Sequence, residues 1–185
     1  YDAFGRVATV SSFAVGADVP RARQAFVYDV SGNVVATDSA YGAEGTATAS
    51  SAFDVQGPEV SATDLSARTV ETRYEGLGRT VSVGGDTYPL MSGYDSAGRK
   101  TQGLTTRDGG ETWDATTWTF DPRSGLNTAK RYADGSQISY AYTDNGRKTR
   151  TTWARGVWKE NAYDAANRIS GVTYSDGTPG VAYSY

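Results

Sequence analysis

The stretch Tyr94-Asp95-Ser96-Ala97-Gly98-Arg99 decides the fold, because versions of it recur along the whole chain. Similar hexapeptides begin at Tyr1, Tyr28, Tyr74, Tyr142 and Tyr163, and two further copies begin at Phe53 and Phe120. Counting Tyr185 as the start of another copy, successive first residues lie 20 to 27 residues apart, with a mean of 23. Self-similarity at such a period is typical of a repeat protein.

Each position of the hexapeptide has a physical explanation. The aromatic residue, which we call the anchor, ends a strand, and its ring is expected to stack on the ring of the neighbouring hairpin. The aspartate is expected to accept hydrogen bonds from the amides of its own turn. The glycine, or Asn167 in the same position, supplies a positive φ. The arginine begins the next strand, where it either pairs with aspartate or lies over a tyrosine ring.

These positions are therefore predicted to be structural repeat anchors. The set comprises Tyr1, Asp2, Gly5, Tyr28, Asp29, Gly32, Phe53, Asp54, Tyr74, Gly78, Arg79, Tyr94, Asp95, Gly98, Arg99, Phe120, Asp121, Tyr142, Gly146, Arg147, Tyr163, Asp164, Arg168 and Tyr185.

A second turn is expected near the middle of most repeats. Asp134-Gly135 and Asp176-Gly177 are hairpin-turn dipeptides, and residues 84–86, 108–110 and 154–156 occupy equivalent places. Helical periodicity is missing. The predicted fold is all-β: tandem β-hairpins of about 23 residues form a wide, curved antiparallel sheet that is part of a spiral or shell. About sixteen strands are expected, and open sheets of more than ~10 strands tend to curl.

The whole chain, residues 1–185, is expected to form one array of about eight repeats, irregular and longer in 1–70 and regular in 70–185. Residues 8–25 and 38–52 are rich in Ala, Ser, Thr and Gly, which predicts looser hairpins or loop insertions. A second aromatic shares the anchor's face in several repeats, as Trp118 does with Phe120, and this stripe is the predicted core layer. The pattern also suggests a piece of a longer protein with unpaired sheet edges, where copies could self-associate.

The composition excludes several classes of function. Cysteine and histidine are both absent, which removes thiol nucleophiles, the commonest general base and the commonest metal ligands. We therefore expect no enzyme activity, no cofactor and no metal. The net charge of −3 gives no electrostatic support for a nucleic-acid partner. No apolar run approaches the length of a membrane span.

The Tyr-Asp-x-x-Gly-Arg copies with their mid-repeat Asp-Gly turns resemble those of the RHS/YD-repeat family over essentially the whole chain. That family includes bacterial polymorphic toxins, the cocoon-forming components of insecticidal toxin complexes, and the animal teneurins. The resemblance implies a sheet strip wound into a hollow shell, which in the toxins encloses a C-terminal toxic domain. It also implies a secreted or cell-surface protein whose partners are the rest of the parent chain. This chain is too short to close such a shell.

Four features of the sequence are alternative candidate sites. The resemblance implies a test of Asp121-Pro122, because toxins of the family cleave themselves near an Asp-Pro motif; an ordinary anchor turn is the favoured interpretation. The basic stretch from Arg147 to Lys159 could hold an anionic polymer, although a hairpin with one solvated face is favoured. The loops at 84–86 and 108–110 supply too few oxygens for calcium. Stacking on sugars would make the chain an adhesion or glycan-binding module, with these contacts: Trp113, Trp118, Trp153 and Trp158.

Overall fold

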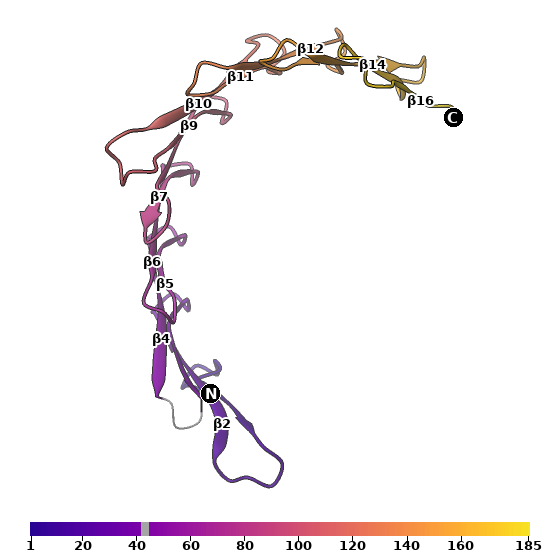
Figure 1. Cartoon of the computed structure of the whole chain (residues 1–185). Coiled ribbons are helices and arrows are strands. Elements are labelled where there is room, and N and C mark those ends of the chain that lie inside the picture. Colours follow the sequence, from indigo (N-terminus) through magenta and orange to yellow (C-terminus); the bar gives the residue numbers. More distant parts are fainter. Residues whose placement is uncertain (42–44) are drawn as a thin grey trace. The chain divides into compact units, whose positions relative to one another are not determined.

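The computed structural model describes residues 1–41 and 45–185, which form strands and turns but no helix. The strand order is the order of the chain from β1 to β16, and every neighbouring pair whose register is known is antiparallel. The prediction of an all-β fold built from tandem hairpins is therefore confirmed. Figure 1 shows each hairpin followed directly by the next along the chain.

The chain divides into two compact units, Tyr1–Met91 and Ser92–Tyr185, which we call unit 1 and unit 2. Unit 1 contains the strands β1 (Thr9–Phe13), β2 (Pro20–Tyr28), β3 (Val34–Tyr41), β4 (Thr46–Phe53), β5 (Glu59–Thr63), β6 (Thr69–Tyr74) and β7 (Thr80–Gly85), and β8 (Leu90–Tyr94) spans the boundary. Those of unit 2 are β9 (Lys100–Thr105), β10 (Asp114–Phe120), β11 (Asn127–Arg131), β12 (Gln137–Tyr142), β13 (Lys148–Thr152), β14 (Trp158–Tyr163), β15 (Ile169–Tyr174) and β16 (Val181–Ala182).

The stretches rich in small residues form strands. Residues 8–25 contain β1 and most of β2, and residues 38–52 contain the end of β3 and nearly all of β4. Their alternating Ala, Ser and Thr side chains suit an extended backbone, in which threonine is favoured. The hairpin alternative therefore describes these stretches better than loop insertions, while residues 42–44 of the second stretch lie outside the described residues.

A register shift falls at the anchor of nearly every repeat. In β2 and β3, Tyr28 pairs with Val34 whereas Val27 pairs with Ala36, so Val35 is an extra residue in β3. The same shift occurs beside Phe53, Tyr74, Phe120, Tyr142 and Tyr163. A bulge of this kind leaves one residue unpaired and disrupts the ladder locally. It thus frees backbone groups next to these anchors.

Within each unit the register places the anchors on one face of the sheet, which we call the anchor face. In β4 the side chains of this face, such as Ala49 and Phe53, are half-buried, while Thr48 and Ser50 on the other face are exposed. Val172, at 7% exposure, is the one buried hydrophobic residue of the described chain. The predicted aromatic core layer is therefore a half-covered surface.

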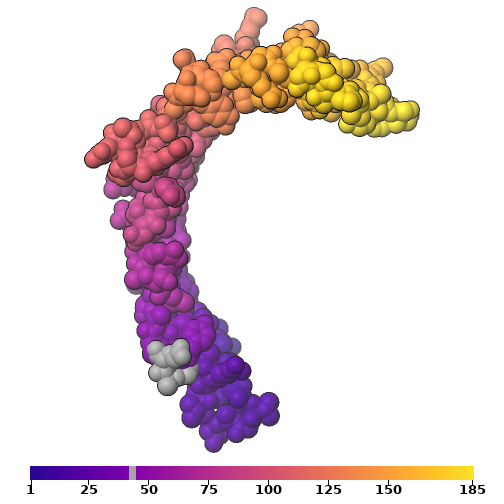
Figure 2. Space-filling view, in the orientation of Figure 1, coloured from indigo at the N-terminus to yellow at the C-terminus, as the bar shows by residue number. Residues whose placement is uncertain are grey.

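The chain exposes far more surface than a compact protein of its size. Its accessible surface is 12466 Å², whereas a compact chain of 19.7 kDa exposes about 8,600 Å². Figure 2 shows the hairpins following one another in sequence order on the visible surface of each unit, without a distant segment laid over them. Stability must therefore come from contacts between neighbouring hairpins.

Candidate functional site: an aspartate–arginine–tyrosine ladder

The anchor turn is held by its aspartate. In the first repeat the amide of Asp2 donates to the carbonyl of Arg6 at 2.8 Å, and the amide of Gly5 donates to the carbonyl of Asp2 at 3.0 Å. Gly5 has a φ of 77°, which completes a three-residue hairpin loop ending in a left-handed residue. The Asp2 carboxylate accepts the amides of Phe4 and Arg6, each at 2.9 Å. The Asp2 side chain thereby accepts hydrogen bonds from two backbone amides of its turn.

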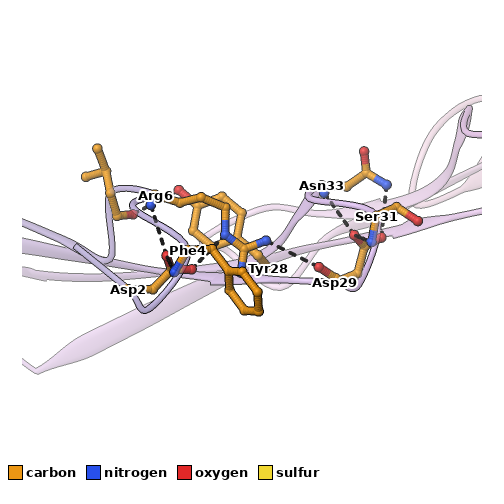
Figure 3. Close-up of polar contacts among 8 residues, drawn as sticks. Asp2, Phe4, Arg6, Tyr28, Asp29, Ser31 and Asn33 are labelled. Carbon is orange, nitrogen blue, oxygen red and sulfur yellow. Dashed lines mark hydrogen bonds and ion pairs between the residues drawn. The ribbon is translucent and has the colours of Figure 1, made fainter.

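The arginine links that turn to the next repeat. The Arg6 Nε donates to the Asp2 Oδ2 at 2.6 Å, and its guanidinium carbon lies 4.3 Å from the centre of the Tyr28 ring. Its Nη1 also reaches the carbonyl of Asp29 at 3.5 Å. Figure 3 shows Arg6 extending from Asp2 across Tyr28 towards Asp29. The ring of the anchor is thus covered by an arginine of the preceding repeat, where ring-on-ring stacking was expected.

The same contacts recur in unit 2. Arg99 lies 4.6 Å from the Phe120 ring centre, Arg147 lies 5.9 Å from that of Tyr163, and Arg168 lies 4.3 Å from that of Tyr185. Arg99 and Arg168 also pair with the aspartates of their own turns, Asp95 and Asp164, at 2.7 and 2.8 Å. We call this recurring arrangement the ladder.

The tyrosine hydroxyl supplies another contact between repeats. Tyr28 donates to the carbonyl of Val7 at 2.8 Å, and Tyr142 donates to that of Asn127 at 2.7 Å. In each of these bonds the acceptor is the residue after the arginine position, and in β5, β11, β13 and β15 it lies next to a bulge. Further examples are Tyr74 to Glu59, Tyr163 to Lys148 and Tyr185 to Ile169. The bulge explains why this carbonyl is available, a relationship that the hexapeptide alone does not reveal.

Several anchor turns depart from the common residues. In the second repeat Asn33 replaces arginine and donates from Nδ2 to Asp29 at 2.9 Å. Asp54 accepts the amide of Gln56 at 2.7 Å. Glu75 in the fourth turn pairs with Arg79, and its Oε2 accepts the Arg79 Nη2 at 2.9 Å. The positions at Gly32, Gly78, Gly98 and Gly146 all have positive φ.

Electrostatics favour the charged form of the turn carboxylates. Hydrogen bonds from the side chain and then the backbone amide of Arg99 hold the pKa of Asp95 below its ordinary value of 3.8. The backbone amide of Arg168 has the leading effect in lowering the pKa of Asp164. These aspartates are therefore anionic at neutral pH, as a hydrogen-bond acceptor in a turn must be.

The mid-repeat turns use the same backbone geometry at the opposite ends of the hairpins. Tyr132 donates its amide to Ser136 and accepts from Gly135, as Asp2 does with Arg6 and Gly5. A turn that sequence reasoning missed lies at 64–68, where the Asp64 carboxylate accepts the Arg68 Nε at 2.9 Å. The spacing of these two residues equals that of Asp2 and Arg6, which is the signal that could have revealed it.

At the mid-repeat end of two hairpins, a side chain takes the place of a cross-strand backbone hydrogen-bond acceptor. The Asp86 Oδ2 accepts the amide of Thr69 at 2.7 Å, and the Ser175 Oγ accepts the amide of Trp158 at 2.9 Å. In each pair the reverse hydrogen bond is also present: the amides of Asp86 and Ser175 donate to the backbone carbonyls of Thr69 and Trp158. The loop at 84–86, weighed above for calcium, thus closes a hairpin.

The Asp108 loop is likewise internally satisfied. The Asp108 carboxylate accepts the hydroxyls of Thr106 and Thr112 and the amide of Thr112 at 3.0 Å. These bonds, that of Thr106 first, hold the pKa of Asp108 well below its usual range. Within residues 1–41 and 45–185, no group of three or more acidic side chains is placed to hold a metal ion.

Asp121 also serves its own turn. Its Oδ1 accepts the amide of Ser124 at 2.7 Å, the hydroxyl of Ser124 at 2.8 Å and the amide of Arg123 at 3.0 Å. The Ser124 amide leads in lowering the pKa of Asp121, whereas a general acid needs a raised pKa. Its contacts are those of a turn residue.

All four tryptophans are half-buried. Two have cations beside their rings: the Trp118 ring centre lies 5.6 Å from the Nζ atoms of both Lys100 and Lys130, and Arg150 lies 4.5 Å from that of Trp158. The Trp113 Nε1 donates to the carbonyl of Gly110 at 3.2 Å. Trp153 begins the mid-repeat turn at 153–157. Trp113 and Trp118 belong to the β9–β10 hairpin, whereas Trp153 and Trp158 belong to the β13–β14 hairpin.

The fold and the ladder define a tandem Tyr-Asp hairpin array. The same fold occurs in a crystal structure of TcdB2-TccC3-Cdc42, with a TM-score of 0.61 and 13% identity over 82% of this chain. It also occurs in TcdB2-TccC3, with a TM-score of 0.61 and 14% identity over 81% of this chain. These neighbours are toxin-complex chains, so the resemblance to the RHS/YD-repeat family is confirmed at the level of the fold.

The chain spans 9% of the length of each of these neighbours. No protein-family model matches the sequence, and no curated protein matches it. No helix of the described residues is long and apolar enough to cross a membrane.

Proposed function

We propose that this chain is a non-enzymatic wall segment of a larger RHS-type shell. The parent protein would be secreted or displayed at a bacterial surface, and its shell would enclose a C-terminal toxin or effector domain. The observation that carries the proposal is the single-layered array, in which contacts link each hairpin to the next and one hydrophobic residue of the described chain is buried. Such an array suits a wall better than a binding pocket.

The arrangement of the acidic groups supports a role without catalysis. The carboxylates of the anchor turns accept hydrogen bonds from their own turns, and the pKa of Asp121 is lowered rather than raised. In this proposal the segment forms one continuous array with further repeats of the parent chain, which pair with its exposed end strand β1.

Limited proteolysis of the full parent protein tests the proposal. A C-terminal domain enclosed by the shell should resist protease in the intact protein. It should be degraded when the array is broken by a Gly85→Ala substitution. Electron microscopy should show a hollow particle. An extended particle with a freely digested C-terminal domain would contradict the proposal.

The alternative of a surface adhesion or glycan-binding module has weaker support. Sugar stacking needs an open aromatic face, whereas Arg150 lies over Trp158 and two lysines flank Trp118. A glycan array probed with the wild-type chain and with Trp113→Ala would distinguish the two functions. Binding that depends on this tryptophan would favour adhesion.

A further inference from the structure

All four lysines of the chain lie in unit 2, at positions 100, 130, 148 and 159. Unit 2 carries 12 Lys and Arg against 10 Asp and Glu, a net charge of +2, while unit 1 carries 6 against 11, a net charge of −5. The acidic balance of the whole chain thus conceals a locally basic unit.

The register places the lysines on the anchor face. Lys130 pairs with Trp118 in β10, and Lys148 pairs with the anchor Tyr142. Lys159 pairs with Thr151, which in turn pairs with Tyr140. Paired residues point to the same side of a sheet, and Tyr140 and Tyr142 share a side because they are two residues apart. Lys100 joins them through its contact with Trp118.

Aromatic rings alternate with these lysines. The Lys130 Nζ lies 5.6 Å from the ring centre of Trp118 and 4.6 Å from that of Tyr132. The Lys148 Nζ lies 4.4 Å from the ring centre of Tyr140. We call this surface, made by the four lysines with Trp118, Tyr132, Tyr140 and Tyr142, the lysine face. A ring lies beside the ammonium groups of Lys100, Lys130 and Lys148 while leaving their N–H donors for a ligand.

The lysines also lack acidic partners. Every ion pair found in residues 1–41 and 45–185 uses an arginine, and none of the four lysines takes part. On the opposite face, by contrast, Arg150 pairs with Glu160 at 3.1 Å. The lysine face is therefore a row of uncompensated positive charge beside apolar rings.

We propose that the lysine face binds an extended, acidic polypeptide segment. Carboxylates of the segment would bind the ammonium groups, and its apolar side chains would contact the rings. The face runs from β9 to β14, which at ~4.8 Å per strand is about 24 Å. An extended peptide of about eight residues covers that distance. This inference stands apart from the wall function, because the chain by itself can be tested for binding.

Charge complementarity favours a peptide over a long polyanion. A nucleic acid or a sulfated polysaccharide carries its charge far beyond a 24 Å patch and is repelled by an acidic chain with a pI near 5.0. A short acidic segment confines its charge to the basic region. Its side chains also provide apolar groups for Trp118 and Tyr140, as recognition of a half-apolar surface requires.

The test uses the 185-residue chain and a fluorescent peptide of alternating glutamate and alanine, with binding measured by anisotropy at low and high salt. Binding should weaken with salt. The double variant Lys100→Gln/Lys130→Gln should weaken it about tenfold, since each exposed ion pair accounts for about a threefold change. The control Arg131→Gln removes one positive charge, as each single lysine substitution does, but from the opposite face of β11, and should leave binding unchanged.

Three outcomes would overturn the proposal. One is the absence of binding at millimolar peptide, and another is an equal loss in the Arg131→Gln variant. The third is tighter, lysine-dependent binding of oligothymidylate or a sulfated oligosaccharide than of the peptide. Far-UV circular dichroism of each variant identifies any that fails to fold, and in that case the single variant Lys148→Gln at an exposed position replaces the double variant.

Discussion

The guanidinium carbon of Arg6 lies 4.3 Å from the centre of the Tyr28 ring, so an arginine of one repeat covers the anchor of the next. The Arg6 side chain also donates a hydrogen bond to Asp2 of its own turn, which holds it in position. The arginine therefore connects its own turn with the neighbouring repeat, and the same relationship in unit 2 can be tested by substitution.

Replacing Arg99 by glutamine should lower the free energy of unfolding by about 1 kcal/mol, since a partly exposed cation–π contact contributes about that much. The affected contact is with the Phe120 ring at 4.6 Å. Urea denaturation followed by circular dichroism measures the change. Arg123→Gln, at the exposed tip of the next turn, is the matched control and should have no effect. Equal losses in both variants would contradict the ladder.

Removing the hydroxyl in Tyr142→Phe should cost about 0.5–1.5 kcal/mol, the usual contribution of a hydrogen bond. The lost bond is that to the carbonyl of Asn127. Phe53 and Phe120 are natural counterparts without a hydroxyl, so Phe120→Tyr should be neutral or stabilising. A stability unchanged in Tyr142→Phe would show that water replaces the protein acceptor.

Alanine at position 85 should destabilise unit 1 by about 2 kcal/mol or more, combining positive-φ strain with a steric clash. Gly85 has a φ of 87°, and a Cβ there would collide with the carbonyl oxygen of Thr69. Gly84→Ala is the control, because a Cβ at that neighbour meets nothing within 4 Å. Thermal unfolding of the two variants should therefore differ clearly.

Ala67→Gly should stabilise the chain by about 0.5–1 kcal/mol. Ala67 has a φ of 60°, which costs an alanine about 1–2 kcal/mol, partly offset by the greater unfolded-state freedom of glycine. Asn167 has a φ of 65° but tolerates that conformation better, so Asn167→Gly should change stability less. Reversal of this order in urea denaturation would argue against the turn geometry at 64–68.

Acid should loosen the anchor turns. The pKa of Asp95 is lowered in the folded chain, so the unfolded chain binds the proton first as the pH falls. The stabilisation is fully present above about pH 4 and is lost as the pH falls through the lower folded value. Melting temperatures measured between pH 7 and pH 2.5 should decline below pH 4. The decline should be smaller in Asp95→Asn, which has already lost the charge.

Sequence reasoning predicts the backbone well and the contacts between repeats less well. The hexapeptide is enough to predict its own turn, because the hydrogen bonds of Asp2 and Gly5 stay within a stretch of five residues. The ring that Arg6 covers, Tyr28, lies 22 residues further along the chain. An aspartate and an aromatic ring were both chemically possible partners of the arginine, and Arg6 contacts one of each. The hydroxyl acceptor at Asn127 lies next to a bulge, which leaves no trace in a single sequence.

The lysine face was hidden for a different reason. In the stretch from Arg147 to Lys159 the charges alternate with threonine and tryptophan, and the sequence does not say which of them share a side. The bulge between Tyr142 and Arg150 changes the parity, placing Lys148 on the anchor face and Arg150 on the other. Only cross-strand register separates the row of lysines from the ion-paired arginine.

The ladder has a consequence for how such a protein changes over generations. Each arginine–aromatic contact of the ladder joins a repeat to its immediate neighbour, as the contacts of Arg168 with Tyr185 and of Arg6 with Tyr28 do. Duplicating or deleting the gene segment that encodes one repeat would therefore recreate the same contact at the new junction and leave distant repeats unchanged. The length of the array can evolve in steps of about 23 residues without a redesigned interior.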